Sequence, residues 1–332
     1  MLFKLLVLFI LFSSIFYCPS TSANTDTVGL TKFNYSSIKK AILEAHNGDT
    51  IFIKPGIYTE SNILIDKDIT IVGHNKHTTF LQASHLSRAY TGRIFTIEEG
   101  VKVGISQITL SNGASKNHGG AIFTKGDLKL LNVTIKDCYA EAPGGGIAVI
   151  NGSCEMENTE ITGNISNSEG GGIYLSNSYM NIIESEIAYN QSNYWGGGIK
   201  TDNAALNIES TSIVENTAKK GGGIFIHLTG ATFYKVDFQE NKSDNRQGGN
   251  LYVFTMDEDL SIFLNACQFI GKQQKGDILQ EAYNSSNYIF MEKSAYNYND
   301  VVQEEKPNGV CKIYYDGIDI FNNSLSAEKD KD

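Results

Sequence analysis

Short clusters of glycine recur along the chain at a nearly constant spacing, and this repeat constrains the fold more than any other feature. Each cluster has the form Gly-Gly-Gly or Gly-Gly-Ala followed by isoleucine, with a weaker sixth copy that ends in leucine. The clusters end at Ile122, Ile147, Ile173, Ile199, Ile224 and Leu251. A second column with the same period consists mostly of asparagine, at Asn112, Cys138, Asn164, Asn190, Asn216 and Asn241. Two columns with a common period of 25–27 residues indicate stacked structural repeats.

Large apolar residues alternate with polar ones inside each repeat. An inward column three residues before the asparagine column comprises Ile135, Ile161, Ile187, Ile213 and Phe238, and similar columns lie eight and ten residues before it. Alternation with a period of two predicts short strands that bury one face. A helical repeat would show apolar residues every 3.6 positions instead. The unit therefore predicts an all-β fold, a solenoid in which each coil of a parallel β-helix stacks on the previous one.

The segment before the repeats has the character of a solenoid cap. Residues 36–45 predict a short amphipathic helix with a serine N-cap, followed by alternating strands. This stretch resembles the entry region of right-handed β-helix proteins with the pectin-lyase-like fold. The repeats resemble those of the chlamydial polymorphic outer-membrane proteins, through Gly119-Gly120-Ala121-Ile122 and Phe238-Gln239-Glu240-Asn241. Together the resemblances cover roughly residues 36–270 and imply a right-handed parallel β-helix with a short N-terminal capping helix.

The order of these features divides the chain into four segments. The first residues carry Lys4, an apolar run and the small residues Thr21-Ser22-Ala23, which is the pattern of a secretory signal. We therefore expect a secreted or cell-surface protein with no transmembrane segment after signal cleavage. The segments are a signal peptide at 1–23, an N-terminal cap at 24–50, the β-helix at 51–270, and a C-terminal cap with a polar tail at 271–332.

Charge, cysteines and sequons limit the partners and modifications. The net charge of −10 argues against a nucleic-acid surface, which normally carries a basic patch. The sequence leaves open whether the four cysteines after the signal form disulfides or buried thiols; they are Cys138, Cys154, Cys267 and Cys311. Sequons that coincide with the asparagine column should be buried and unmodified. The remaining candidates for glycosylation are Asn34, Asn132, Asn151, Asn284 and Asn322.

Catalytic and metal-binding patterns are weak. The sequence lacks the full set of motifs that polygalacturonases share, which are Asn-Thr-Asp, Asp-Asp, Gly-His-Gly and Arg-Ile-Lys. Asn117-His118-Gly119-Gly120 is only a partial match to the third of these. Glu160 and Glu186 occupy equivalent positions on adjacent coils, but Ser212 interrupts their column. The six histidines are dispersed and predict no metal site. We therefore expect no catalytic residues, no metal and no cofactor.

The residues directly before the glycine clusters vary while the glycines stay constant, which is typical of loops stacked along one face. Aromatic and basic side chains there could be ordinary exposed loop residues or a recognition surface for sugar rings or proteins. The candidates are His118, Tyr194, Trp195, Lys219, Lys220 and Arg246. Our hypothesis is a non-enzymatic, adhesin-like protein that binds a glycan or an extracellular protein through this face. The alternative is a carbohydrate-active lyase or hydrolase of the pectin-lyase-like fold.

Overall fold

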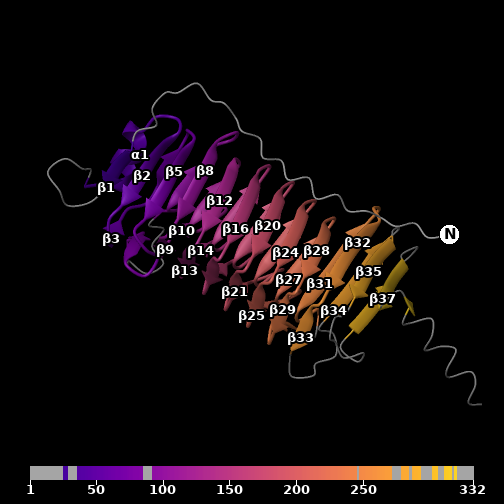
Figure 1. Cartoon of the computed structure of the whole chain (residues 1–332). Coiled ribbons are helices and arrows are strands. Elements are labelled where there is room, and N and C mark those ends of the chain that lie inside the picture. The colour runs from indigo at the N-terminus through magenta and orange to yellow at the C-terminus, as the bar shows by residue number, and fades with distance from the viewer. Residues whose placement is uncertain are drawn as a thin grey trace, which may run out of the picture.

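The protein is an elongated stack of parallel β-coils, a solenoid of about 8 turns (Figure 1). The computed structural model describes residues 25–28, 36–84, 92–244, 247–270, 278–283, 286–292, 301–305, 310–315 and 318–319. The expected signal peptide, Asn34, Arg246, Asn284, Asn322 and the polar tail after residue 319 lie outside the described residues.

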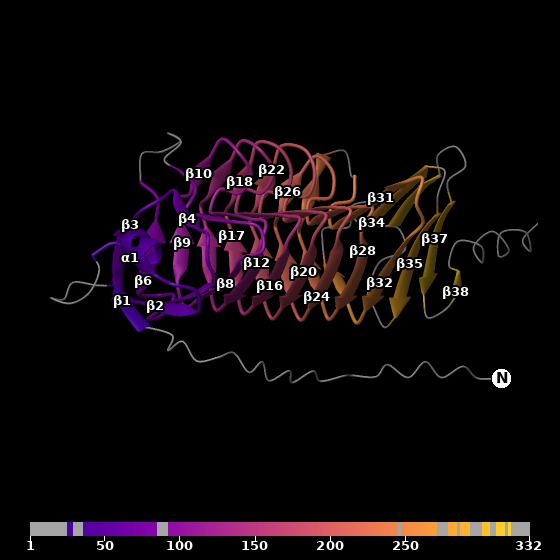
Figure 2. The same cartoon turned by 90° about the horizontal axis from the view of Figure 1, so that it is seen from above.

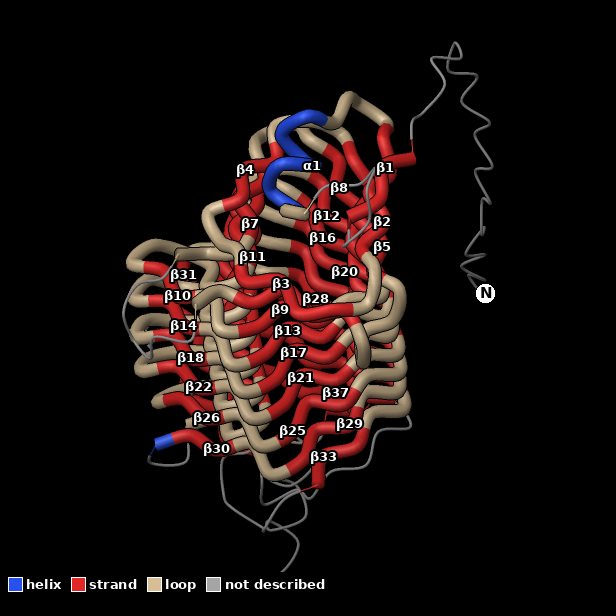
Figure 3. Tube along the Cα trace, turned by 90° about the vertical axis from the view of Figure 1, so that its left-hand side faces the viewer, coloured by secondary structure: helices blue, strands red, loops and turns tan. Residues whose placement is uncertain are grey.

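Four sheets run along the stack, and Figure 3 shows them from one end of the molecule. Sheet A has thirteen strands: β1 (Thr25–Val28), β2 (Asp49–Ile53), β5 (Ile69–Gly73), β8 (Lys102–Ser106), β12 (Asp127–Leu131), β16 (Ser153–Glu157), β20 (Tyr179–Ile183), β24 (Ala205–Glu209), β28 (Gly230–Tyr234), β32 (Leu260–Asn265), β35 (Ser286–Glu292), β37 (Val310–Tyr315) and β38 (Ile318–Asp319). Sheet B has nine strands: β3 (Gly56–Thr59), β6 (Thr79–Gln82), β9 (Thr109–Ser111), β13 (Thr134–Lys136), β17 (Glu160–Thr162), β21 (Glu186–Ala188), β25 (Ser212–Val214), β29 (Asp237–Gln239) and β33 (Gln268–Ile270).

Sheets C and D complete each coil. Sheet C has ten strands: β4 (Ile63–Ile65), β7 (Phe95–Ile97), β11 (Ile122–Thr124), β15 (Ile147–Ile150), β19 (Ile173–Ser176), β23 (Ile199–Asp202), β27 (Ile224–His227), β31 (Leu251–Met256), β34 (Ile278–Tyr283) and β36 (Val301–Glu305). Sheet D has six short strands: β10 (Ala114–Ser115), β14 (Tyr139–Ala140), β18 (Ile165–Ser166), β22 (Gln191–Ser192), β26 (Thr217–Ala218) and β30 (Lys242–Ser243). A regular coil passes through sheets C, A, B and D in that order. Among the described strands, every pair is parallel except β37 with β38.

The apolar columns predicted from the alternation form the core between the sheets. The isoleucine that ends each glycine cluster pairs in register with its counterpart one coil on, for example Ile173 with Ile199. The column three residues before the asparagines is also in register, as Ile161 with Ile187 shows. All of these side chains are buried. The predicted columns are confirmed, because the period of two and the coil length together place equal residues on top of each other.

One short helix covers the N-terminal end of the core, as predicted. α1 (Ile38–Glu44) buries Ile38, Ala41 and Ile42, and the Ser37 side chain accepts a hydrogen bond from the Lys40 amide at 3.2 Å. The Glu60 carboxylate accepts hydrogen bonds from the Ile38 amide at 2.8 Å and from the Lys39 amide at 2.8 Å. A carboxylate at this end satisfies free amide groups of the first turn. Among the described residues, no helix has the length and apolarity to cross a membrane.

Each glycine of a cluster has its own steric reason, as the fourth cluster shows. Gly196 has a φ of +65°, a left-handed conformation that favours glycine. A Cβ on Gly197 would lie 2.5 Å from the Thr217 amide nitrogen, since the strand of sheet D from the next coil passes directly beside it. A Cβ on Gly198 would lie 2.7 Å from the Gly223 carbonyl oxygen. The clusters therefore let the chain return closely along sheet D before it enters sheet C.

The asparagine column forms a buried ladder between sheets B and D. The Asn164 side chain donates to Asn190 Oδ1 at 3.0 Å and to the Ile135 carbonyl at 3.1 Å, and the pattern repeats in the following coils. The prediction was wrong for Asn112. Gly113 takes the equivalent position, where its amide donates to Cys138 Sγ at 3.3 Å. The coil at this point is 25 residues long, pairing Ala114 with Tyr139, so the column shifts by one residue.

The cysteines and sequons are partly described. Cys138, Cys154 and Cys267 are buried free thiols, whereas the side chain of Cys311 lies outside the description. Burial raises the pKa of Cys138 and that of Cys154 to about 12. Two of the glycosylation candidates are described. Asn151 is exposed in a turn, and Asn132 is half-buried with its amide nitrogen 2.6 Å from Gln107 Oε1.

Candidate functional site

The variable loops form a continuous ridge along the molecule. In each coil the chain runs outward along its strand of sheet D, turns, and returns through the glycine cluster to sheet C. The turns of successive coils therefore stack at one edge of the molecule, next to the sheet D strands β10, β18, β22 and β26 in Figure 2. We call residues 116–118, 141–143, 167–169, 193–195 and 219–220 the loop ridge. Its turns are joined by backbone hydrogen bonds, such as the Gly170 amide to the Trp195 carbonyl at 2.9 Å and the Gly196 amide to the Lys220 carbonyl at 3.0 Å.

Four of the six predicted site residues lie together on this ridge. Tyr194 and Trp195 are 49% and 40% exposed. Lys219 Nζ lies 4.7 Å from the centroid of the Tyr194 ring, a distance at which a cation is attracted to the ring face. Lys220 is paired with Trp195 through a parallel β-bridge. Aromatic and cationic side chains of adjacent coils therefore share one exposed patch, which we call the Trp195 patch.

The other two predicted residues do not belong to this patch. His118 lies three coils away, where its ring is 6.1 Å from Phe123 and 6.2 Å from Tyr174. Burial, together with the positive charge of Arg93, lowers the pKa of His118. Arg93 donates to the His118 carbonyl at 3.0 Å and is therefore part of the support of this loop. Arg246 lies outside the described residues.

The Trp195 patch rests on a column of outward-facing side chains of sheet C that the sequence analysis missed. Trp195 stacks on Phe225, with centroids 5.2 Å apart, and Phe225 stacks on Tyr252 at 4.7 Å. The Lys220 ammonium donates a hydrogen bond to Tyr252 Oη at 2.7 Å. Phe225 and Tyr252 are buried, although they point away from the main core. The sequence does indicate these positions. Each such residue directly follows the isoleucine or leucine that ends a glycine cluster, and because side chains alternate along a strand, it points outward.

Lys200 occupies the same outward column and is 1% exposed. Its Nζ donates to the Thr201 carbonyl at 2.7 Å and lies 5.0 Å from the Phe225 ring centroid and 5.9 Å from that of Trp195. Burial lowers the pKa of Lys200, partly offset by the negative charges of Asp202 and Glu169. The buried cation therefore lies within reach of two aromatic rings.

Titratable groups collect beside Lys200, and we call Glu169, Tyr174, Asp202 and His227 the acid–base cluster. His227 Nδ1 lies 2.8 Å from Asp202 Oδ1. The hydrogen bond from His227 lowers the pKa of Asp202, whereas burial raises the pKa of Glu169. Burial and the negative charge of Asp202 raise the pKa of Tyr174. Two carboxyl groups with opposite pKa shifts thus lie near one another, an arrangement that can support acid–base chemistry.

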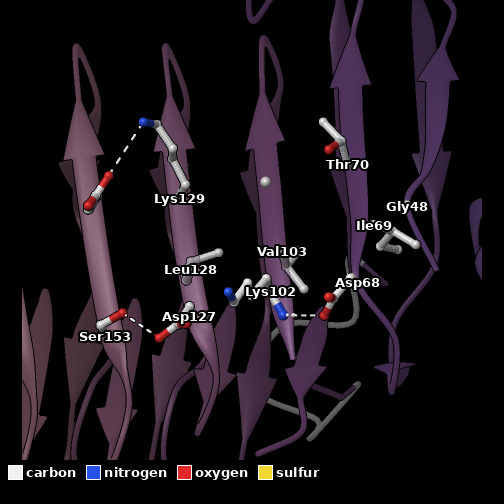
Figure 4. A pocket seen from close by; sticks show the side chains of 12 residues that line it. Gly48, Asp68, Ile69, Thr70, Lys102, Val103, Asp127, Leu128, Lys129 and Ser153 are labelled. Atoms are coloured by element: carbon white, nitrogen blue, oxygen red, sulfur yellow. Dashed lines mark hydrogen bonds and ion pairs between the residues drawn. The ribbon is translucent and has the colours of Figure 1, made fainter. Parts of the chain in front are cut away.

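Sheet A carries hollows on its outer face, which no sequence motif indicated. The one in Figure 4 has a volume of about 480 Å³ and lies over strands β5, β8, β12 and β16. Its floor includes Gly104, which stands in register between Thr70 and Lys129. Polar contacts cross the strands around it, including Ser153 Oγ to Asp127 Oδ1 at 2.7 Å and the ion pair of Lys129 with Glu155 at 3.4 Å. Gly104 has no side chain, so nothing projects from this position into the hollow.

The acidic pair on sheet B shows no metal site. Glu160 and Glu186 are in register, as expected from their spacing, and Ser212 follows. Glu160 accepts hydrogen bonds from the Lys76 ammonium at 3.0 Å and from the Thr134 hydroxyl at 3.1 Å. Burial alone would raise the pKa of Glu160, but these hydrogen bonds and the charge of Lys76 outweigh it, and the pKa is lowered. Within the described ranges there is no group of three or more His, Cys, Asp or Glu side chains placed to hold a metal ion.

Comparison with known proteins identifies the fold. No characterised protein matches the chain in sequence. Among solved structures it is similar to the pectin methylesterase from carrot, at 13% identity over 89% of each chain, with a TM-score of 0.37. It is also similar to pectin methylesterase PemA from Erwinia chrysanthemi, at 11% identity over 90% of this chain and 91% of that one, with a TM-score of 0.38. The family model "Right handed beta helix region" matches residues 71–243. The chain therefore belongs to the family of right-handed β-helix proteins.

Proposed function

We propose that this protein is a secreted or cell-surface β-helix protein that binds a glycan or an extracellular protein through the Trp195 patch. The observation that carries the proposal is the exposed pair Tyr194 and Trp195, flanked by Lys219 and Lys220 and seated on a buried aromatic stack. Exposed aromatic rings beside cations are the groups that dominate binding at many protein surfaces. The resemblance of the repeats to chlamydial polymorphic outer-membrane proteins supports an adhesin-like role.

The support beneath the patch favours binding. Side chains that are already fixed lose little conformational entropy when a ligand arrives, which increases affinity. Trp195 is fixed by stacking on Phe225, and Lys220 by its hydrogen bond to Tyr252. The ammonium groups of Lys219 and Lys220 favour a partner with carboxylate or sulfate groups. An acidic saccharide is therefore the glycan to test first.

The test is binding of hexagalacturonate and of a heparin hexasaccharide to the purified protein, measured by calorimetry. We expect Trp195→Ala and Lys219→Ala each to weaken binding at least tenfold. Tyr179→Ala is the matched control, since Tyr179 is 41% exposed but belongs to sheet A. A pulldown with the same variants tests protein partners. Binding that is equal in the wild type and in Trp195→Ala would remove the patch from the proposal.

A second candidate function, cleavage of a polysaccharide, is favoured by the acid–base cluster. In such a reaction water would replace the leaving sugar at the glycosidic bond. Glu169, whose pKa is raised by burial, would donate a proton to the leaving oxygen, and the carboxylate of Asp202 would take a proton from the attacking water. The test is product release from hexagalacturonate by the wild type and by Asp202→Asn. Release above background that Asp202→Asn abolishes would favour the enzyme, and no release favours the binding protein.

A further inference from the structure

Aromatic side chains form a second, separate row near the C-terminal end of sheet A. Phe263, Phe290 and Tyr314 are in register on strands β32, β35 and β37. Their ring centroids are 5.1 Å apart at both steps, and their planes differ by 13° and 11°. Phe263 is 49% exposed, so the row begins with an aromatic ring that solvent reaches. Phe290 and Tyr314 are half-buried, so the row forms an apolar patch, and such patches often mark binding sites.

The row lines a hollow of about 630 Å³ on the outer face of the sheet. Asn265 and Glu292 line the hollow on the neighbouring outward column, and the Asn265 amide donates to Glu292 Oε2 at 3.0 Å. Thr232, which is in register with Phe263, lines it where the row of rings ends. A concave site of this size, mostly apolar and with a few polar groups, is the usual form of a small-ligand site.

We propose that this hollow binds a neutral saccharide. The rings offer apolar surface for the C–H groups of a sugar, and the amide of Asn265 and the carboxylate of Glu292 offer hydrogen-bond partners for its hydroxyl groups. Among the described residues that line the hollow, Glu292 is the one with a charged side chain. Its negative charge disfavours an acidic sugar at this position. The site thus has the opposite charge preference to the Trp195 patch.

The neighbouring strands allow the saccharide to be longer than the hollow. Toward the N-terminus, the column that contains Phe263 continues through Thr232 to Asn207 and Asn181. Hydroxyl and amide side chains therefore follow the aromatic rings at the strand spacing of about 4.8 Å. A linear oligosaccharide that lies across the coils meets apolar rings at one end and hydrogen-bonding side chains at the other.

The test is binding of three neutral probes, cellohexaose, mannohexaose and N-acetylchitohexaose, to the whole protein by calorimetry. We expect at least one probe to bind, with an affinity at least tenfold lower in Phe263→Ala. Glu292→Gln, which keeps an acceptor but loses the charge, should weaken it several-fold. The matched control is Phe52→Ala, because Phe52 is 41% exposed on strand β2 of the same sheet.

The outcomes separate this site from the proposed function. Trp195→Ala should leave neutral-probe binding unchanged, whatever it does to acidic saccharides. The proposal is overturned if none of the three probes binds, or if Phe263→Ala binds as tightly as the wild type. It is also overturned if Phe52→Ala has the same effect as Phe263→Ala. Circular dichroism of each variant checks that the β-helix is intact.

Discussion

Asn190 Nδ2 donates a hydrogen bond to Asn216 Oδ1 at 3.0 Å, and both side chains are buried between successive coils. Asn164, Asn190 and Asn216 each donate in this way to the ladder asparagine of the next coil. The same Nδ2 group also donates to a backbone carbonyl of the previous coil, which is Ile161 in the case of Asn190. The same contact that stabilises one corner of the solenoid therefore also sets the register of the coils.

Asn190→Ala should destabilise the protein strongly. It removes the acceptor of the Asn164 amide and of Asn164 Nδ2, and leaves the Ile161 carbonyl without its donor. Each buried polar group left unpaired costs about 1–3 kcal/mol, so we expect a loss of about 3 kcal/mol or more. Urea unfolding measures it. Asn193→Ala is the control, since its hydrogen bond to Asn167 is exposed. Equal unfolding midpoints for the two variants would contradict this role of the ladder.

Gly197→Ala should cost about 3 kcal/mol or prevent folding, because a Cβ there would clash with the Gly222 carbonyl oxygen. Gly230→Ala is the matched control. Gly230 lies in strand β28, and a Cβ there would meet nothing within 4 Å. We expect its stability to stay within about 0.5 kcal/mol of the wild type. The melting temperatures of the two variants test this prediction. If Gly197→Ala lowers the melting temperature no more than Gly230→Ala, the chain does not pass as closely along sheet D as described.

Lys200→Met should stabilise the protein near neutral pH by about 1–3 kcal/mol, since it removes a buried cation while keeping an apolar chain of similar length. The lowered pKa also predicts a pH dependence. Between the folded pKa of Lys200 and its ordinary value of 10.5, the unfolded chain binds more protons than the folded one. The stability contributed by this group therefore rises with pH in that interval. The free energy of unfolding, measured at several pH values, should show this rise in the wild type and not in Lys200→Met.

Cys138 and Cys154 should resist alkylation in the folded protein. Their thiols are buried, and with a pKa of about 12 they remain protonated at pH 8, whereas the thiolate is the reactive form. Mass spectrometry after iodoacetamide treatment should find both unmodified in buffer and modified in guanidinium chloride. Failure to label them in denaturant without reductant would instead indicate that they are oxidised.

Glycosylation should follow exposure rather than the presence of a sequon. In a host that glycosylates, we expect a glycan on Asn151, which is exposed, and none on Asn190, which is 1% exposed. Asn132 should be modified less than Asn151, since its amide nitrogen is engaged with Gln107. Peptide mass spectrometry after glycosidase treatment reads each site. A glycan on Asn190 would mean that modification precedes formation of the ladder.

The sequence by itself determined the coil. Apolar alternation, the glycine clusters and the asparagine column are local patterns with one period, and a parallel stack is the arrangement that places equal residues, such as Ile173 and Ile199, in register. The error at Asn112 arose because one coil is a residue shorter, and only the pairing of Ala114 with Tyr139 shows where the column shifts.

Only the tertiary structure decided what covers each outward face. Phe225 and Lys200 are outward residues by alternation, which predicts exposure, yet the loop ridge folds over them and buries both. Phe263 has the same alternation and remains exposed in a hollow. Alternation tells which side of a strand a residue occupies, but burial depends on whether another part of the chain lies over that side. This contact joins segments about 30 residues apart, such as Trp195 and Phe225, and no local pattern encodes it.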